Sequence, residues 1–293
     1  MQNNELLIQH LANETGQSLK NITLTPVYGG DINHCYHLKA NNISWFIKLN
    51  DAELEAMFVA EAAGLKELSQ TKTLKIPEVI TYGNNGQQSY LVLEYLSLGK
   101  SSSNSDKLLG RQLAQLHRQK QPFYGWHIDN TIGKTPQHNQ RNDDWVTFWQ
   151  QQRLAKQLQL AAQNGHRGKL QSQGEKLCAN IGKFFSNYQP QASVVHGDLW
   201  GGNAAVDMQG NPVIFDPACY YADREVDLAM TELFGGYSHN FYAAYEEEWA
   251  LDEGYNVRKT LYNLYHILNH LNLFGRGYAS QASGMISKLL AEL

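Results

Sequence analysis

The chain has 293 residues, of which 42% are hydrophobic and 18% charged, the composition of an ordinary globular protein with a substantial core. Its net charge of -4 argues against a nucleic-acid partner, which would call for a basic surface. No apolar run approaches the ~18 residues of a membrane span, and the N-terminus lacks the basic region and cleavage site of a signal peptide. Cys35, Cys178 and Cys219 are widely spaced and odd in number, as reduced thiols are. We therefore expect a cytoplasmic protein with no nucleic-acid or membrane partner.

The first fifty residues change from a helix pattern to strand patterns. Residues 5–12 have the spacing of a short amphipathic helix. Residues 21–49 alternate β-branched or aromatic residues with polar ones, which predicts three antiparallel strands. Between these strands we expect a glycine-rich turn at Gly29–Gly30 and a hairpin turn at Asn41–Asn42.

One helix and two further strands complete this small sheet-containing part. Apolar residues recur at helical spacing over residues 54–68. Strand-like runs follow at 79–82 and 90–95, separated by a segment with turn composition. The Ser- and Gly-rich stretch SLGKSSSNSD, residues 97–106, is a predicted linker.

Helical patterns dominate the rest of the chain. They cover residues 108–118, 145–160 and beyond, and 243 to the C-terminus. Short strand-like pieces lie at residues 194–195, 204–207 and 213–215.

The stretch VVHGDLWGGN, residues 194–203, places polar groups directly behind a buried-strand pattern. Asp198 could accept a hydroxyl proton, and the amide oxygen of Asn203 could ligate a hard cation such as Mg²⁺. Asp216 ends the strand-like run PVIFD, 18 residues after Asp198, and could share that metal. This order of residues corresponds to the catalytic loop and metal-binding Asp of the kinase template. Taken alone, Asp198 and Asn203 could simply be turn residues of a hairpin.

Three upstream features fit the same chemistry. Lys48 lies in the apolar strand pattern SWFIKLN, where a cation is costly unless it is paired. Glu61 follows on the predicted helix and could orient Lys48 toward phosphate, while Gly29 and Gly30 would let the backbone approach it. Singly, these are an edge-strand lysine, a solvated carboxylate and an ordinary turn; together and in this order they predict phosphoryl transfer.

These residues lie in stretches that resemble a known family. VVHGDLWGGN, VIFDPACYYADREVDLAMTELFGGY, FIKLN and MFVAEAAGL are similar to the fructosamine and ketosamine kinases, a branch of the aminoglycoside/choline kinase-like fold. FYGWHIDNTIGKTPQHNQRNDDWVTFWQQQRL, residues 123–154, is similar to that family's own insertion. The resemblance implies an α+β, two-lobed protein-kinase-like fold. Residues 1–97 would be an ATP-covering lobe, an antiparallel sheet with one helix, and residues 98–293 a larger, mainly helical catalytic and substrate-binding lobe.

The implied activity is ATP-dependent phosphorylation of the 3-hydroxyl of ketosamines. These are ribulosamine, erythrulosamine or fructosamine adducts, free or protein-bound, and the reaction is a deglycation step. Carried over by motif position, Asp198 would be the catalytic base, and Asn203 and Asp216 the Mg²⁺ ligands. Lys48 would contact the α- and β-phosphates with Glu61 as its partner.

The resemblance also implies adenine and substrate contacts. Glu94, Tyr95 and Leu96 would form the hinge whose backbone meets adenine, and Asp227 would brace the catalytic loop. The implied substrate residues are Trp200, Asp129, Asn130, Gln137 and Asn139.

The chain departs from the family pattern at several positions. The loop sequence is GGDIN, with Asp31 where some members carry a redox-active cysteine, and Cys35 lies four residues on, so we do not expect a redox-switched dimer. We expect a monomer or a weak homodimer. Arg141 stands where the family usually has Trp, which leaves details of the substrate pocket open.

Two other functions are open to such a chain. One is a kinase of another small hydroxyl compound, such as an aminoglycoside, choline or a sugar, against which the block at residues 129–139 argues. The other is a nucleotide-binding pseudokinase, against which the presence of Lys48, Asp198, Asn203 and Asp216 argues. A metal pair at His266 and His270 is less favoured than a buried helix with satisfied histidines.

Overall fold

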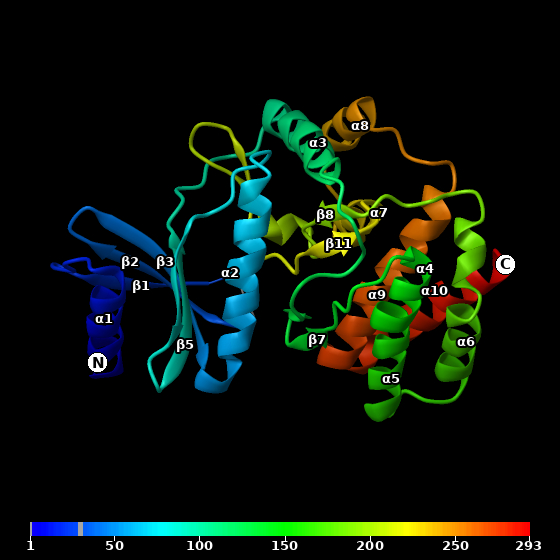
Figure 1. The fold of residues 1–293 in the computed structure, drawn as a ribbon, viewed down its shortest axis with the longest axis horizontal. Coiled ribbons are helices and arrows are strands. Elements are labelled where there is room, and N and C mark those ends of the chain that lie inside the picture. The colour runs from blue at the N-terminus through cyan, green and yellow to red at the C-terminus, as the bar shows by residue number, and fades with distance from the viewer. Residues whose placement is uncertain (1, 29–31) are drawn as a thin grey trace.

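The computed structural model describes residues 2–28 and 32–293, and the side chains from residue 5 on within that range. The predicted turn at Gly29–Gly30, together with Asp31, lies outside the described residues. Figure 1 shows a sheet with a helix on each side, next to a larger and mainly helical part.

The N-terminal part is built on one five-stranded antiparallel sheet in the order β1-β2-β3-β5-β4. Ala40 pairs with Ile43 across the predicted Asn41–Asn42 turn, and Asn41 has a φ of 51°, which Asn tolerates. The strands are β1 (Thr23–Val27), β2 (His34–Ala40), β3 (Ile43–Asp51), β4 (Val79–Asn84) and β5 (Gln88–Glu94).

Side-chain alternation gives this sheet two apolar faces. Trp45, Ile47 and Leu49 of β3 pack in a cluster with residues of α1 (Gln2–Thr15). The other face packs against α2 (Glu55–Gln70) through Phe58, Ala62 and Leu65. The sheet therefore lies between two helices: α1 contains the short helix predicted at residues 5–12, so this part of the chain has one helix more than the single one that the family resemblance implied.

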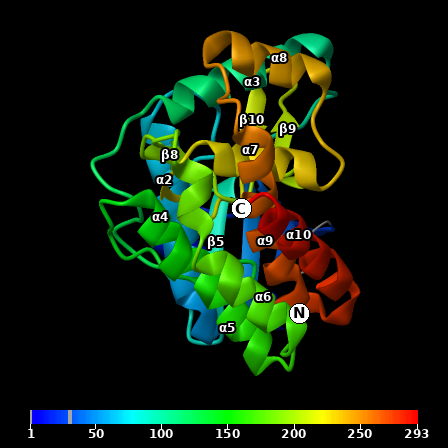
Figure 2. The same ribbon diagram turned by 90° about the vertical axis from the view of Figure 1, so that its right-hand side faces the viewer.

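The second part holds the remaining helices and three short two-stranded sheets. Figures 1 and 2 show α3 and α8 side by side at one end and α5, α6, α9 and α10 at the other. The helices are α3 (Ser103–His117), α4 (Trp145–Phe148), α5 (Ala155–Gln163), α6 (Lys169–Cys178), α7 (Glu225–Leu233), α8 (His239–Glu248), α9 (Tyr255–Phe274) and α10 (Ala279–Ala291). The strands are β6 (Asn130–Ile132), β7 (Thr135–Gln137), β8 (Ser193–Val195), β9 (Ala204–Val206), β10 (Pro212–Ile214) and β11 (Tyr220–Ala222).

Several expected boundaries differ from the structure. The predicted linker 97–106 is shorter, because Ser102 caps α3 and residues from Ser103 on are helical. The helical pattern from residue 145 is broken by a π-helical segment, Trp149–Leu154, and the pattern from residue 243 is divided among α8, α9 and α10. β6, β7 and β11 were not expected, whereas the equally short β8, β9 and β10 lie at the predicted strand-like pieces.

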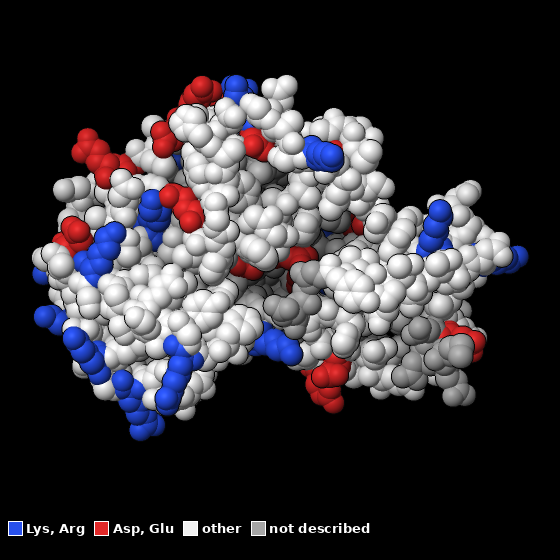
Figure 3. All heavy atoms as spheres, turned by 180° about the vertical axis from the view of Figure 1, so that it is seen from behind, with Lys and Arg blue, Asp and Glu red and all other residues white. Residues whose placement is uncertain are grey.

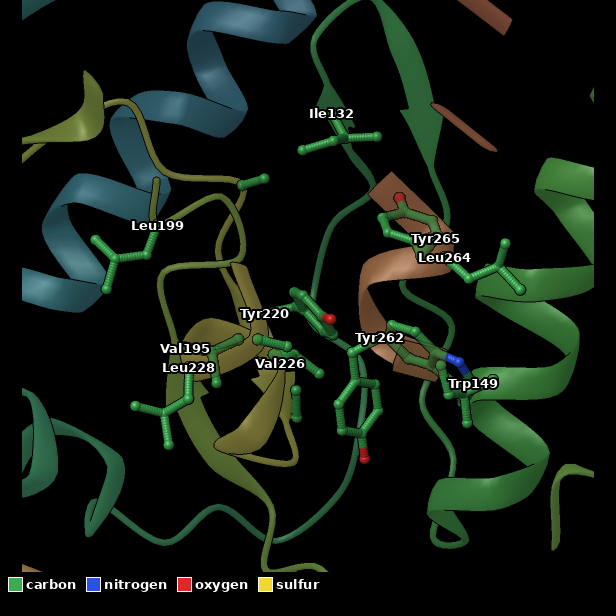
Figure 4. Close-up of a cluster of buried hydrophobic side chains, with 14 of the residues drawn as sticks. Ile132, Trp149, Val195, Leu199, Tyr220, Val226, Leu228, Tyr262, Leu264 and Tyr265 are labelled. Atoms are coloured by element: carbon green, nitrogen blue, oxygen red, sulfur yellow. The ribbon is translucent and has the colours of Figure 1, made fainter. Parts of the chain in front are cut away.

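The main hydrophobic core lies in the second part and is rich in aromatic residues. Trp149, Tyr220, Tyr262 and Tyr265 are buried in it, and Figure 4 shows them with neighbouring apolar side chains. Within the described ranges, no helix has the length and apolar character needed to cross a membrane.

The two parts contact each other at two places that matter for the site. Gly64 of α2 packs so closely on the second part that a Cβ there would lie 3.0 Å from the Cβ of Cys219. At the far end of α2, Lys75 forms an ion pair of 2.9 Å with Asp207, and its carbonyl accepts a hydrogen bond from Ile214.

Candidate active site

Lys48 lies between two carboxylates where the two parts meet. Because side chains alternate along β3, Lys48 faces α2 while its neighbours Ile47 and Leu49 face α1. Its Nζ lies 2.6 Å from Oε1 of Glu61 on α2 and 2.6 Å from Oδ1 of Asp216 in the second part. Burial alone would lower the pKa of Lys48, but the charges of Asp216 and Glu61 raise it, so the ammonium group stays charged.

Asp227 on α7 holds the backbone of the loop that carries Asp198. The Asp227 carboxylate accepts the backbone N–H groups of His196 at 2.7 Å and Gly197 at 2.8 Å. The His117 Nε2 contacts the same carboxylate at 3.1 Å. Burial would raise the pKa of Asp227, but the hydrogen bonds and charges of His117 and His196 lower it below its usual value. Gly197 has a φ of 82°, and a Cβ there would lie 2.2 Å from the Ala218 carbonyl oxygen, so only glycine fits.

The β9–β10 hairpin brings Asn203 and Asp216 to the same place. Ala204 pairs with Ile214, and the Phe215 N–H donates to the Asn203 carbonyl at 3.1 Å, so Asp216 directly follows the residue opposite Asn203. His196 reaches the same segment through its Nε2, which donates to the Phe215 carbonyl at 2.9 Å. One short hairpin thus brings Asp216 back to the loop that carries Asp198, although the two lie 18 residues apart in the sequence.

Asp198 is half-buried beside Asn203. The Asn203 Nδ2 donates to Oδ2 of Asp198 at 3.2 Å and to its carbonyl at 2.9 Å. Oδ1 of Asp198 has no hydrogen-bond partner among the described residues. Burial, followed by the nearby charge of Asp216, raises the pKa of Asp198 to about 7.

One cavity of about 600 Å³ between the two parts is lined by Lys48, Glu61, Asp198, Asn203 and Asp216. Seen from behind, the molecule is hollowed between its two parts, and acidic atoms are visible in the hollow (Figure 3). The cavity runs from Cys35 and Lys48 past Asp198 to Trp200, and onward to the C-terminal end of α9. A volume of this size suits a nucleotide phosphate group together with a small acceptor.

The oxygen atoms at the cavity floor suit a magnesium ion. Oδ1 of Asn203 and Oδ2 of Asp216 make no hydrogen bond within the described part of the chain, and oxygen donors are those that Mg²⁺ prefers. No cluster of three or more His, Cys, Asp or Glu side chains that could hold a metal is found among residues 2–28 and 32–293. Asn203 and Asp216 could supply one oxygen each, and Mg²⁺ in kinase sites takes further ligands from the nucleotide phosphates.

The predicted hinge is partly occupied by the protein's own hydrogen bonds. The Glu94 N–H donates to the backbone carbonyl of Glu78 at 2.8 Å, and the Tyr95 N–H donates to the backbone carbonyl of Ser44 at 3.3 Å. The Leu96 N–H has no partner among the described residues, so it is the donor of this segment that remains for a ligand. Gly29 and Gly30 lie outside the described residues; the first described residues after them in the sequence, Ile32 and Asn33, line the cavity.

The predicted substrate residues fall into two groups. Trp200, 39% exposed, and Asn130 line the cavity with Asp198. Gln137, the last residue of β7, and Asn139, two residues later, are buried and do not line the cavity. Asp129 is exposed and binds His138 at 2.9 Å.

The cavity also has a wall that the sequence did not predict. His266, Asn269 and His270 of α9 line it together with Phe234 and Phe274. The helical spacing of the α9 residues indicated one face, but nothing in the sequence placed that face beside Asp198.

The chain matches the family model described as fructosamine kinase over residues 3–292. It is 43% identical to a probable ketoamine kinase of Synechocystis over 98% of this chain and 96% of the relative. It is 38% identical to a chloroplastic protein-ribulosamine 3-kinase of Arabidopsis thaliana, over 95% of this chain and 86% of the relative. A crystal structure of a putative fructosamine-3-kinase from Haemophilus somnus superposes with a TM-score of 0.87 at 30% identity, with 96% of each chain covered.

Proposed function

The chain belongs to the fructosamine kinase family and is an ATP-dependent ketosamine kinase with a two-lobed, protein-kinase-like fold, and we propose that it transfers the γ-phosphoryl group of MgATP to the 3-hydroxyl of a ketosamine. Residues 1–97 and 98–293 would be its two lobes. The observation that carries the site assignment is Lys48 held at 2.6 Å from both Glu61 and Asp216, in one cavity with Asp198.

Lys48 binds and orients the nucleotide phosphates in this proposal. Its ammonium group is charged and buried, so its field is little screened by water. Glu61 fixes the direction of the Lys48 side chain from α2. Phosphoryl transfer depends mainly on such positioning and on neutralising phosphate charge.

Asp198 is the proposed general base. Its Oδ2 is held by Asn203, which leaves Oδ1 to accept the proton of the acceptor hydroxyl. The hydroxyl oxygen forms the new bond to the γ-phosphorus while the bond to the ADP oxygen breaks. Asp227 and His196 act on this step indirectly, by holding the backbone of the Asp198 loop.

Asn203 and Asp216 are the proposed Mg²⁺ ligands. When bound, the cation would neutralise charge on the β- and γ-phosphate oxygens. Asp216 contacts Lys48 through Oδ1, so its second oxygen, Oδ2, would be the one to hold the cation.

The acceptor is proposed to lie between Trp200 and the β6–β7 hairpin. An aromatic face such as that of Trp200 suits both a sugar and an ammonium group, and the Asn130 edge of the cavity is polar. Gln137, Asn139 and Asp129 do not line the cavity, and the Asp129 carboxylate binds His138 and the Asn139 N–H, so we assign these three to support of the hairpin. Adenine would meet the Leu96 N–H and the carbonyls of Glu94 and Tyr95.

The cellular role follows as a proposal from this activity. Phosphorylation of the adduct would be a deglycation step in the cytoplasm, where three unpaired cysteines such as those of this chain are kept reduced. We propose a monomer or a weak homodimer as the working form.

A transfer assay with labelled ATP tests the function. The panel contains ribulosamine, erythrulosamine and fructosamine derivatives of lysine, each free and in a peptide, with choline and an aminoglycoside as competing acceptors. We expect label on at least one ketosamine, at its 3-hydroxyl. Turnover of choline or an aminoglycoside with none of any ketosamine would overturn the proposal, and no transfer to any acceptor would favour a pseudokinase.

A further inference from the structure

Asp216 sits in an unusual backbone conformation that its neighbours maintain. Its φ is 59°, in the left-handed region that side chains other than glycine seldom adopt. Such a conformation costs free energy and persists where surrounding contacts over-determine it. On one side, His196 supplies these contacts, donating from Nε2 to the Phe215 carbonyl and accepting the Ala218 N–H at its own carbonyl, 2.9 Å in each case.

On the other side, two buried amides hold the next carbonyls of the chain. The Gln137 Nε2 donates to the Ala218 carbonyl at 3.2 Å, and the Asn130 Nδ2 donates to the Cys219 carbonyl at 2.8 Å. Gln137 also donates to Oδ1 of Asn130 at 2.8 Å, so the two amides fix each other. We call Asn130 and Gln137 the amide clamp. Both side chains come from the β6–β7 hairpin.

The amide clamp is anchored from behind by further buried polar groups. The Tyr265 hydroxyl of α9 donates to Oε1 of Gln137 at 2.8 Å, so every polar atom of the Gln137 amide is used. The Asn139 Nδ2 donates to Oδ1 of Asn130 at 2.9 Å. Asn139 in turn accepts a hydrogen bond of 2.7 Å from Nη2 of Arg153.

Arg153 is a fully buried cation with no carboxylate in ion-pair contact among the described residues. Its guanidinium lies 4.2 Å from the ring centre of Tyr220 and 4.8 Å from that of Phe148, and its Nη1 donates to the His138 carbonyl at 2.5 Å. It projects from the π-helical segment, a rare conformation that recurs at functional sites. Figure 4 labels two aromatic residues that Arg153 contacts, Tyr220 and Tyr265, and shows Ile132 of the hairpin near Tyr265.

We propose that the amide clamp, with Gln137 as its central member, is a positioning device that holds Asp216 in its metal-binding conformation. The proposal rests on the function proposed above, because it assigns Asp216 a Mg²⁺ ligand role. Gln137 acts through Ala218 and is outside the cavity lining, so it is a positioning residue and does not touch the nucleotide or the acceptor.

Loss of the Gln137 amide from the clamp would let Asp216 relax without removing a group that lines the cavity. A displacement of about 1 Å at a reacting centre lowers the rate by about 100-fold, and the effect falls on the step where geometry matters. ADP binding without metal should therefore persist, while the gain in ADP affinity on adding Mg²⁺ should shrink. This loss of coupling separates positioning from a purely structural role.

The test compares Gln137→Met with wild type. Met keeps the volume of Gln but donates no hydrogen bond to Ala218. We expect kcat for the ketosamine to fall about 10- to 100-fold with little change in the KM for ATP. Isothermal titration of ADP with and without Mg²⁺ should show a several-fold smaller metal-dependent gain in affinity. Circular dichroism melting records how much of each protein is folded.

Gln150→Met is the matched control, because the Gln150 Nε2 also donates to a backbone carbonyl, that of Cys178, at 2.8 Å. It should keep the wild-type kcat and metal coupling. If Gln137→Met does not fold, Tyr265→Phe takes its place, because it removes the hydroxyl that donates to Oε1 of Gln137. It should lower kcat and the metal-dependent gain in ADP affinity by smaller factors.

Two outcomes would overturn the clamp: a folded Gln137→Met protein with wild-type kcat and metal coupling, or losses that track only the folded fraction. If wild type itself phosphorylates no ketosamine, the proposed function fails, and the ADP titrations still decide on the clamp.

Discussion

Lys48 is the residue on which most of the candidate site depends. A buried ammonium group is costly unless it is paired, and Lys48 is paired with carboxylates from two different elements. The strand period alone sets the face on which it lies. α2 packs on the same face of the sheet through an apolar stripe. Glu61 flanks this stripe and therefore lies next to Lys48.

Asp198→Asn is predicted to lower kcat by about 100- to 10,000-fold, because the amide cannot accept the hydroxyl proton. The shape of the side chain and its place beside Asn203 are kept, so ADP should bind with nearly unchanged affinity. Steady-state kinetics and ADP titration measure the two effects.

Asp143→Asn is the control for this prediction, since the Asp143 side chain is 79% exposed and pairs only weakly, at 3.4 Å, with Arg141. It should leave kcat unchanged. Turnover of Asp198→Asn within a few-fold of wild type would contradict the assignment of Asp198 as base.

His266 makes the stability of the fold depend on pH. Burial lowers its pKa to about 3, whereas in the unfolded chain it is about 6.5. The unfolded state therefore binds more protons between these values, so the unfolding free energy is full above pH ~6.5 and falls as pH decreases. The expected loss from this residue between pH 6.5 and 5 is about 2 kcal/mol.

His266→Phe, which cannot titrate, tests this expectation by urea unfolding at pH 7.5, 6.5, 5.5 and 5 (about one-half to one unit apart). Its unfolding free energy should decline less steeply than that of wild type over this range. The residual slope should come in part from His117 and His196, whose pKa values burial also lowers. Parallel curves for the two proteins would show that His266 does not contribute.

At the scale of elements, α2 is fixed by contacts with the second, mainly helical part of the molecule as well as with its own sheet. Gly64 lets the helix approach Cys219, and the Tyr221 hydroxyl donates to Glu67 on α2 at 2.8 Å. These contacts lie on the helix that carries Glu61. The packing of α2 on both parts thus positions Glu61 beside Lys48.

Gly64→Val is predicted to push α2 away from the second part of the molecule. A Cβ at position 64 would lie 3.0 Å from the Cβ of Cys219 and 3.4 Å from the Cγ of Pro217. Overpacking of this kind costs about 1–3 kcal/mol. We expect a lower melting temperature and a higher KM for ATP, as Lys48 loses its orientation by Glu61.

Ser69→Val on an exposed position of the same helix is the matched control and should change neither quantity beyond the helix-propensity effect. A Gly64→Val protein with wild-type KM would mean that the position of α2 does not govern Lys48.

For the whole molecule, the β9–β10 turn joins the two parts and belongs to the hairpin that brings Asn203 close to Asp216. Asp207 accepts the backbone N–H groups of Gln209 and Asn211 at 2.9 Å each, and Lys75 binds its other oxygen. Beside it, the Gly99 N–H donates to the Val206 carbonyl at 2.7 Å, which fixes the connection to α3. One carboxylate therefore supports both the turn and the contact between the parts.

Asp207→Asn is predicted to lower the melting temperature by several degrees, because it removes the charge that Lys75 pairs with and one hydrogen-bond acceptor of the turn. The Lys75 interaction lowers the pKa of Asp207, so its contribution is full at neutral pH and is lost only in strong acid. Differential scanning calorimetry at pH 7 measures the change. A melting temperature equal to that of wild type would contradict this role.

The sequence by itself determined the chemistry of this protein and most of its elements. The order of Lys48, Glu61, Asp198, Asn203 and Asp216 indicated a kinase site, since each residue type has a required place along such a chain. The five strands of the first sheet and α2 follow from their periods, which are long enough to be read. The resemblance to the fructosamine kinases, carried by stretches such as VVHGDLWGGN, agrees with the family match.

Only the tertiary structure decided how these residues are held and what surrounds them. The insertion block at residues 129–139 predicted substrate contacts, but packing turns Gln137 and Asn139 inward, where they hydrogen-bond to Ala218 and Asn130. The α9 wall of the cavity and the place of Arg153 depend on contacts between residues more than a hundred positions apart or on a short π-helical segment. Local periodicity carries no information on such contacts, because they are set by which apolar faces pack together in the folded chain.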